Sequence, residues 1–286
     1  MKKQEICLGL MGGTGLSAVE QIYLMKKTGF DGFFFGWKKS MDLSILVEAA
    51  KDTDMRIQSV HAPFKDMATI WQEDSSKSQD AVEELCQCIE ECSEAGINLI
   101  IMHSFIGFED HTPNDIGLYR IGQIVSKAKE KNVKLAFENT EGEEYLKAIL
   151  DNFGQSQTVG FCWDTGHQLC YNHGEDMMEK YGELLLATHL NDNLGISSPE
   201  GTITWLDDLH LLPFDGIADW DYIVKRLDDY SFSGPLTFEL SVTSKPGRYE
   251  NDVYRNMPFE EYLKEVYKRA CLIATKRNTH KKELNI

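Results

Sequence analysis

The sequence has few basic residues for its length. Among its 286 residues, 29 lysines and arginines face 46 aspartates and glutamates, so the formal net charge is −17. Proteins that grip nucleic-acid phosphates gain most of their affinity from Lys and Arg. The excess of acidic residues therefore disfavours a nucleic-acid partner.

Long apolar runs and paired cysteine motifs are also absent. No run of about 18 apolar residues occurs, so no transmembrane helix and no membrane partner are expected. The segment 1–12 lacks the long apolar stretch and cleavage site of a signal peptide, and we expect a cytoplasmic protein. Seven scattered cysteines without a CxxC pair favour reduced thiols over a disulfide framework or zinc ribbon. The oligomeric state stays open, a homo-oligomer included.

Short apolar runs alternate with longer amphipathic segments along the whole chain. The apolar runs predict strands at 6–11, 31–37, 56–60, 99–102, 134–137, 159–163, 185–190 and 236–238. Helical periodicity is found at 17–27, 41–53, 78–95, 114–131, 141–153, 175–183, 219–230 and 258–276. Continuously apolar strands are typical of a parallel sheet covered on both faces.

Eight such βα units, with no Pro-, Gly- or Ser-rich linker between them, predict the fold class. In this length they fit a closed (β/α)₈ TIM barrel of the α/β class better than an open doubly wound sheet. We expect a single domain over residues 1–286, with a polar tail at about 277–286 that is frayed. The longest irregular stretch, 193–216, follows the seventh strand, and a loop of that length is usually functional.

Six consecutive predicted strands end in a titratable residue. These are His61, His103, Glu138, Asp164, His189 and Glu239. A barrel gathers the carboxyl ends of its strands at one mouth, where active sites lie. Imidazoles and carboxylates at this density suit a divalent cation, without which the carboxylates would repel one another. We predict a metal centre that holds Mn²⁺ or Zn²⁺, with Co²⁺, Fe²⁺ and Mg²⁺ left open because their ligand sets overlap.

The strand ends and their flanks resemble the xylose isomerase-like TIM-barrel superfamily. The matching segments are SVHAPF at 59–64, FENT at 137–140, WDTGH at 163–167, HLND at 189–192 and DLHLLPFDG at 208–216. The superfamily contains sugar isomerases and epimerases and also the endonuclease IV type of abasic-site nuclease. One departure is that the second strand ends in Gly36 and Trp37, where epimerase-like members often have an acidic residue.

Resemblance to the ketose 3-epimerase branch implies a sugar substrate and one bound metal. The matched ligands are Glu138, Asp164, His189 and Glu239. The two glutamates would also exchange the proton at the epimerised carbon through a metal-stabilised enediolate. His167 would contact substrate oxygens. Trp37, Phe64, Trp71 and Trp205 are candidates to stack on a sugar face, and Lys65 and Arg248 are scattered candidates for a phosphate.

Resemblance to the endonuclease IV branch implies three zinc ions held by nine ligands. The additional ligands would be His61, His103, His167, Asp208 and His210, and all nine residue types are present. Three features favour the sugar hypothesis: the net charge, the APFKD loop after His61, and the 193–216 loop, which is acidic and has no Lys or Arg. A sugar-binding barrel without catalysis stays a third hypothesis.

Overall fold

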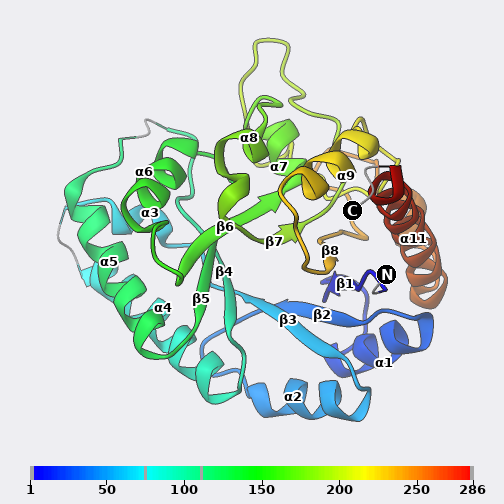
Figure 1. The fold of residues 1–286 in the computed structure, drawn as a ribbon, viewed down its shortest axis with the longest axis horizontal. Coiled ribbons are helices and arrows are strands. Elements are labelled where there is room, and N and C mark those ends of the chain that lie inside the picture. The colour runs from blue at the N-terminus through cyan, green and yellow to red at the C-terminus, as the bar shows by residue number, and fades with distance from the viewer. Residues whose placement is uncertain (1–2, 74–75, 110–111, 284–286) are drawn as a thin grey trace.

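The fold is a barrel of eight parallel strands inside a ring of helices (Figure 1). The computed structural model describes residues 3–73, 76–109 and 112–283. The strands are β1 (Ile6–Gly9), β2 (Gly32–Gly36), β3 (Arg56–His61), β4 (Leu99–His103), β5 (Lys134–Glu138), β6 (Val159–Asp164), β7 (Leu185–His189) and β8 (Leu236–Phe238). The sheet order is β7-β6-β5-β4-β3-β2-β1-β8. Strands that are consecutive in the chain are therefore neighbours in the sheet, except for β7 and β8.

The remaining gap, between β7 and β8, is bridged by one residue. The Leu190 amide donates to the Thr237 carbonyl at 2.8 Å, and the Glu239 amide donates to the Leu190 carbonyl at 3.2 Å. These two bonds close the sheet on itself, which removes its edges. The predicted (β/α)₈ TIM barrel is therefore confirmed.

Among the described residues, eight α-helices lie where helices were predicted, and three further short ones were not predicted. The first set is α1 (Ala18–Thr28), α2 (Leu43–Asp52), α4 (Ser76–Glu94), α5 (Asp115–Glu130), α6 (Glu143–Phe153), α8 (Met177–Tyr181), α9 (Trp220–Asp229) and α11 (Phe259–Glu283). The short helices are α3 (Met67–Ile70), α7 (Thr165–Cys170) and α10 (Asp252–Arg255). Each short helix lies in a segment that follows a strand, where turn residues hide the helical period.

The tail prediction is corrected by the last helix, α11. It continues to Glu283, seven residues beyond the predicted end at Lys276, so the segment expected to be frayed is helical as far as Glu283. Arg277 is buried in α11 and donates to the Asp228 carboxylate at 2.8 Å. Breaking a buried pair of this kind is costly, so it holds the end of α11 against α9. Residues 284–286 lie outside the described ranges.

Two apolar cores are found on the two sides of the sheet. The larger lies between the strands and the helices, and the smaller consists of Ile101, Ala136, Cys162 and Ala187 inside the barrel. Side chains alternate along a strand, so the last residues of β4 to β7, two positions further on, face the same interior. His103, Glu138, Asp164 and His189 therefore lie directly above the inner core.

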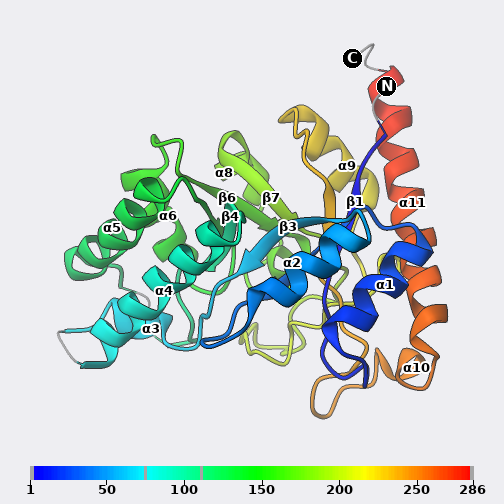
Figure 2. The same ribbon diagram turned by 90° about the horizontal axis from the view of Figure 1, so that it is seen from below.

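The mouth of the barrel is built by the loops that follow the strands. In Figure 2 the loops after β7 (yellow-green) and β8 (orange) extend from the same end of the barrel, opposite both chain termini. An antiparallel bridge between Asp192 and Leu211 ties the loop after β7 back to its strand. All seven cysteines are free thiols. None of the helices described is long and apolar enough to cross a membrane.

Candidate metal centre

Three carboxylates and one imidazole form a central group at the carboxyl ends of β5 to β8. Glu138, Asp164, His189 and Glu239 each place a ligand atom within 4.8 Å of the others. The first three are the last residues of their strands and are 0% exposed, and Glu239 follows β8 directly. Three carboxylates this close together, two of them fully buried, repel one another strongly in a medium of low polarity, and a cation would relieve that repulsion.

Asp164 is held in place by its neighbours on both oxygens. Its Oδ1 accepts a hydrogen bond from the His167 amide at 2.6 Å, which caps α7, and its Oδ2 accepts from Asn191 Nδ2 at 2.8 Å. Asn191 approaches so closely that a side chain at Gly166 would meet its Oδ1 at 1.8 Å. The DTGH segment therefore needs glycine at this position to keep the carboxylate oriented.

His189 joins the two glutamates of the central group. Its Nδ1 lies 2.8 Å from Glu138 Oε1 and 3.0 Å from Glu239 Oε2, and its ring stacks on Phe34 at 4.6 Å. Burial works against charge on the ring, yet the two carboxylates hold the pKa of His189 well above its usual range. Two ligands bound about 2.1 Å from one cation at a right angle stand about 3 Å apart, so these separations fit a shared cation.

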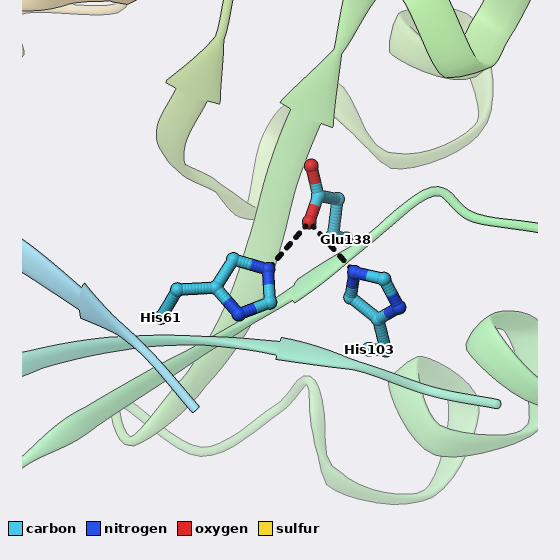
Figure 3. Close-up of side chains that lie close together, drawn as sticks. All are labelled: His61, His103 and Glu138. Carbon is cyan, nitrogen blue, oxygen red and sulfur yellow. Dashed lines mark ion pairs between the residues drawn. The ribbon is translucent and has the colours of Figure 1, made fainter. Parts of the chain in front are cut away.

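Glu138 is also the centre of a second group, with the histidines of β3 and β4. The Nε2 atoms of His61 and His103 each lie 3.5 Å from Glu138 Oε2. The dashed lines in Figure 3 mark these two pairs. The His103 ring stacks on Phe64 at 4.4 Å. Burial lowers the pKa of His103 to about 3, so this ring is neutral and offers a lone pair.

A third group, nearer to solvent, comprises His167, Asp208 and His210. Asp208 Oδ2 lies 2.9 Å from His210 Nε2, and Asp208 Oδ1 lies 3.5 Å from His167 Nε2. His210 adopts a left-handed φ of 48°, an uncommon backbone for a residue other than glycine. A fourth partner is the Lys245 ammonium, which lies 3.3 Å from Asp208 Oδ2.

Several buried polar atoms of these groups lack hydrogen-bond partners among the described residues. They are His103 Nδ1, Glu138 Oε2, His167 Nδ1, His189 Nε2 and Asp208 Oδ1. Buried polar atoms without partners are rare in proteins, and a bound ion can satisfy them. The donor set of imidazole nitrogens and carboxylate oxygens is one that Zn²⁺ or Mn²⁺ takes. Cys162 lies near Glu138 and His189 as well, but burial raises the pKa of its thiol, so it belongs to the inner core.

A cavity of about 740 Å³ opens above the three groups. Glu239, His61, His103, His167, Asp208 and His210 line it together with Trp37, Phe64 and Trp205. Glu138 stands below the cavity, because its side chain is fully buried, whereas the Glu239 side chain is 25% exposed. This volume is in the range of small-molecule pockets.

All nine residues predicted from the strand ends and the loop after β7 therefore meet at one mouth, in the three groups described. Two other predictions are corrected: Trp71 is buried away from the cavity, where it donates to the Ser104 carbonyl, and Arg248 pairs with Glu250. Sequence reasoning missed the positioning residues Asn139 and Asn191. Asn139 Oδ1 accepts a hydrogen bond from the Asp164 amide at 2.8 Å. Asn139 directly follows Glu138 and Asn191 lies two residues after His189, and this closeness to strand-end ligands was the available signal.

Glu141 is a further carboxylate of the cavity wall that the strand-end pattern did not indicate. It is buried, and its Oε1 accepts a hydrogen bond from the Gly107 amide at 2.9 Å. Burial raises the pKa of its carboxyl above the ordinary value. Ionisation of Glu141 therefore destabilises the fold. This destabilisation is absent below the pKa of the unfolded state and reaches its full size above the pKa of the folded state.

We predict that Glu141→Gln stabilises the metal-free protein increasingly as pH rises from 4 to 8. Glutamine keeps an oxygen for the Gly107 amide but cannot ionise. Urea unfolding of the variant and the wild type at several pH values measures the difference. A difference that stays constant, or shrinks toward pH 8, would contradict the burial argument.

Comparison with known proteins assigns this barrel to a family. Residues 22–258 match the family described as Xylose isomerase-like TIM barrel. The chain belongs to this family. The chain spans 34% and 42% of the length of two curated proteins that it matches. One of them, "Probable endonuclease 4" of Acholeplasma laidlawii, is 28% identical over 127 residues, 41% of this chain.

Solved structures of the xylose isomerase-like fold superpose over nearly the whole chain. An L-ribulose 3-epimerase has a TM-score of 0.74 and 15% identity, with 99% of this chain and 97% of that chain covered. The IOLI protein, solved with a bound zinc atom, also has a TM-score of 0.74, with 17% identity over 96% and 99% of the two chains. At these identities the likeness concerns the fold.

Proposed function

We propose that this protein is a metal-dependent isomerase or epimerase of a sugar or sugar derivative. One observation carries the proposal: three carboxylates and His189 converge beneath a cavity of small-molecule size, and one of these carboxylates, Glu239, lines it. The zinc-bearing and epimerase structures on the same fold support this proposal. Glu138, Asp164, His189 and Glu239 would hold the cation.

In this mechanism Glu239 acts first. Its carboxylate takes a proton from the carbon next to a carbonyl, and the C–H electron pair forms a C=C bond while the carbonyl oxygen gains negative charge. A bound cation would supply the stabilisation of that oxygen. For epimerisation, Glu138 in its protonated form would deliver a proton to the opposite face while Glu239 keeps the proton it took, and exchange of both carboxyls with solvent would reset the site. For isomerisation, Glu239 would return its proton to the neighbouring carbon, while the hydroxyl proton of the first carbon passes to the former carbonyl oxygen. His167 and His210 stand where substrate hydroxyls would be bound.

The test is solvent exchange over a panel of ketoses in D₂O, together with the metal content per chain. We expect one tightly bound cation and deuterium at the carbon next to the carbonyl of at least one sugar. Sugar binding without exchange for every ketose tested would instead support a non-catalytic barrel.

A second candidate is an abasic-site phosphodiesterase with three zinc ions. It is favoured by the three groups of donors, whose nine residues are all present, and by the endonuclease-named relative. Against it stands Lys245, whose ammonium already neutralises Asp208 in the outer group. About three zinc ions per chain and nicking of abasic duplex would overturn the isomerase proposal.

Lys245 also yields a prediction that separates the two candidates. A divalent cation near an ammonium group a few Å away is disfavoured by about 2 kcal/mol even at the dielectric constant of water. We expect Lys245→Met to bind an additional zinc ion at least about tenfold more tightly than the wild type. Zinc titration measures this, with Lys134→Met, at the other end of β5, as the control. Wild-type protein that already binds three zinc ions equally well would contradict it.

A further inference from the structure

Three lysines, which we call the cationic rim, line one side of the cavity above the metal centre. Lys38 follows β2, Lys65 lies in the loop after β3, and Lys245 lies in the loop after β8. The strands β3, β2, β1 and β8 are consecutive in the barrel. The rim therefore occupies one arc of the mouth, whereas the histidine and carboxylates of β5 to β7 occupy the opposite arc.

The carboxylates that share this cavity are already engaged. Glu239 contacts His189 at 3.0 Å, Glu141 accepts from the Gly107 amide, and Asp208 contacts both His210 and Lys245. Lys38 and Lys65, by contrast, have no ion pair or hydrogen bond from their side chains within the part of the chain that the structure describes. The charge left without a partner in the cavity is thus positive, although the protein as a whole carries −17.

Lysines elsewhere in this acidic chain often have carboxylate partners. Lys3, Lys27, Lys147, Lys225 and Lys276 each contact an Asp or Glu within 3.0 Å on the outside of the protein. Two ammonium groups without such a partner, on loops of neighbouring strands and facing one cavity, are suited to an anion from solution. Lys245, at the end of this arc, lies 5.5 Å from the centre of the Trp205 ring.

We propose that the cationic rim binds an oxyanion at the end of the substrate distant from the metal. The substrate would be a sugar derivative that carries a phosphate or a carboxylate. This inference rests on the proposed isomerase function for the reacting end, but the subsite itself is testable by binding alone. Lys38 and Lys65 supply the charge, and the Phe64 ring in the same cavity stacks on His103 of the metal groups at 4.4 Å.

The experiment compares each ketose of a panel with its terminal phosphate ester and its terminal carboxylate. Binding by calorimetry and turnover are measured for the metal-loaded wild type, for Lys38→Met/Lys65→Met, and for Lys134→Met as a control that also loses a lysine. Hydrogen bonds to charged groups give the expected size: the double variant should lose at least about tenfold in preference for the anionic sugar. The control should keep it.

The outcomes separate the subsite from the reaction. A preference for the anionic over the neutral sugar that disappears in the double variant supports the rim. Whichever binds more tightly, the phosphate ester or the carboxylate, identifies the oxyanion. No preference in the wild type, or one that the double variant keeps, overturns it while turnover can still stand. Preferential binding without turnover supports the rim and overturns the isomerase. Abasic duplex binding that is lost in the double variant, with no sugar preference, assigns the lysines to nucleic acid and overturns the proposal.

Discussion

Replacing Glu239 by glutamine is expected to lower turnover by about 10² to 10⁴-fold, the usual contribution of a general acid or base. Glutamine has nearly the same shape and keeps an oxygen toward the cation, but it cannot accept the substrate proton. Glu138, Asp164 and His189 remain as ligands, so the cation should stay bound. Deuterium exchange into a ketose and metal content, measured on the same sample, record both effects.

The control for this variant is Glu200→Gln. Glu200 is an exposed carboxylate in the loop after β7 and accepts a hydrogen bond from the Ser198 hydroxyl. The Glu200→Gln variant loses the same charge without touching the cavity, so its deuterium exchange into the ketose should match that of the wild type. Full exchange activity in Glu239→Gln would sink the proposed mechanism. Loss of both exchange and metal would show that Glu239 acts chiefly as a ligand.

Removing the cation is expected to destabilise the fold. A ligand that binds only the folded state at a thousandfold excess over its Kd stabilises by about 4 kcal/mol. For a chain of this size that corresponds to a fall of roughly 10 °C in the thermal midpoint on chelation. The physical reason is that the carboxylates of Glu138, Asp164 and Glu239, the first two fully buried, are then left close together around a single imidazole. Thermal unfolding with Zn²⁺ or Mn²⁺ and with a chelator measures the shift.

A matched pair of variants tests that the shift comes from this centre. His189→Asn replaces the ring nitrogen that faces both glutamates by an amide, a much weaker ligand for Zn²⁺, so the cation-dependent shift should largely vanish. His173→Asn removes an exposed histidine whose φ of 55° asparagine tolerates, and the shift should persist. A shift of equal size in both variants would place the stabilising cation elsewhere.

The strands were predictable because each is a short, continuously apolar run that must be buried on both faces. Their polar last residues stood out for the same reason: His61 or Glu138 interrupts an apolar run at a position that is still buried. The predicted strands ended one residue early at β3 to β6, since a titratable residue breaks the apolar pattern although it still belongs to the sheet.

Helices fixed by tertiary contacts were less predictable. Helix α7 begins inside a Thr-Gly-His segment because Asp164 caps it, and that carboxylate also belongs to the metal centre. The end of α11 is held by the pair of Arg277 with Asp228, 49 residues apart in sequence. Neither signal exists in a local window of residues.

By itself, the sequence determined that eight βα units form a barrel and that carboxylates and imidazoles end its strands, because both follow from local hydrophobic patterning. Only the tertiary structure decided how those residues divide into three groups and which one is open to the cavity. It alone also brought Lys38, Lys65 and Lys245 to one arc of the mouth. These lysines come from separate loops, and barrel closure, which no local pattern encodes, makes them neighbours.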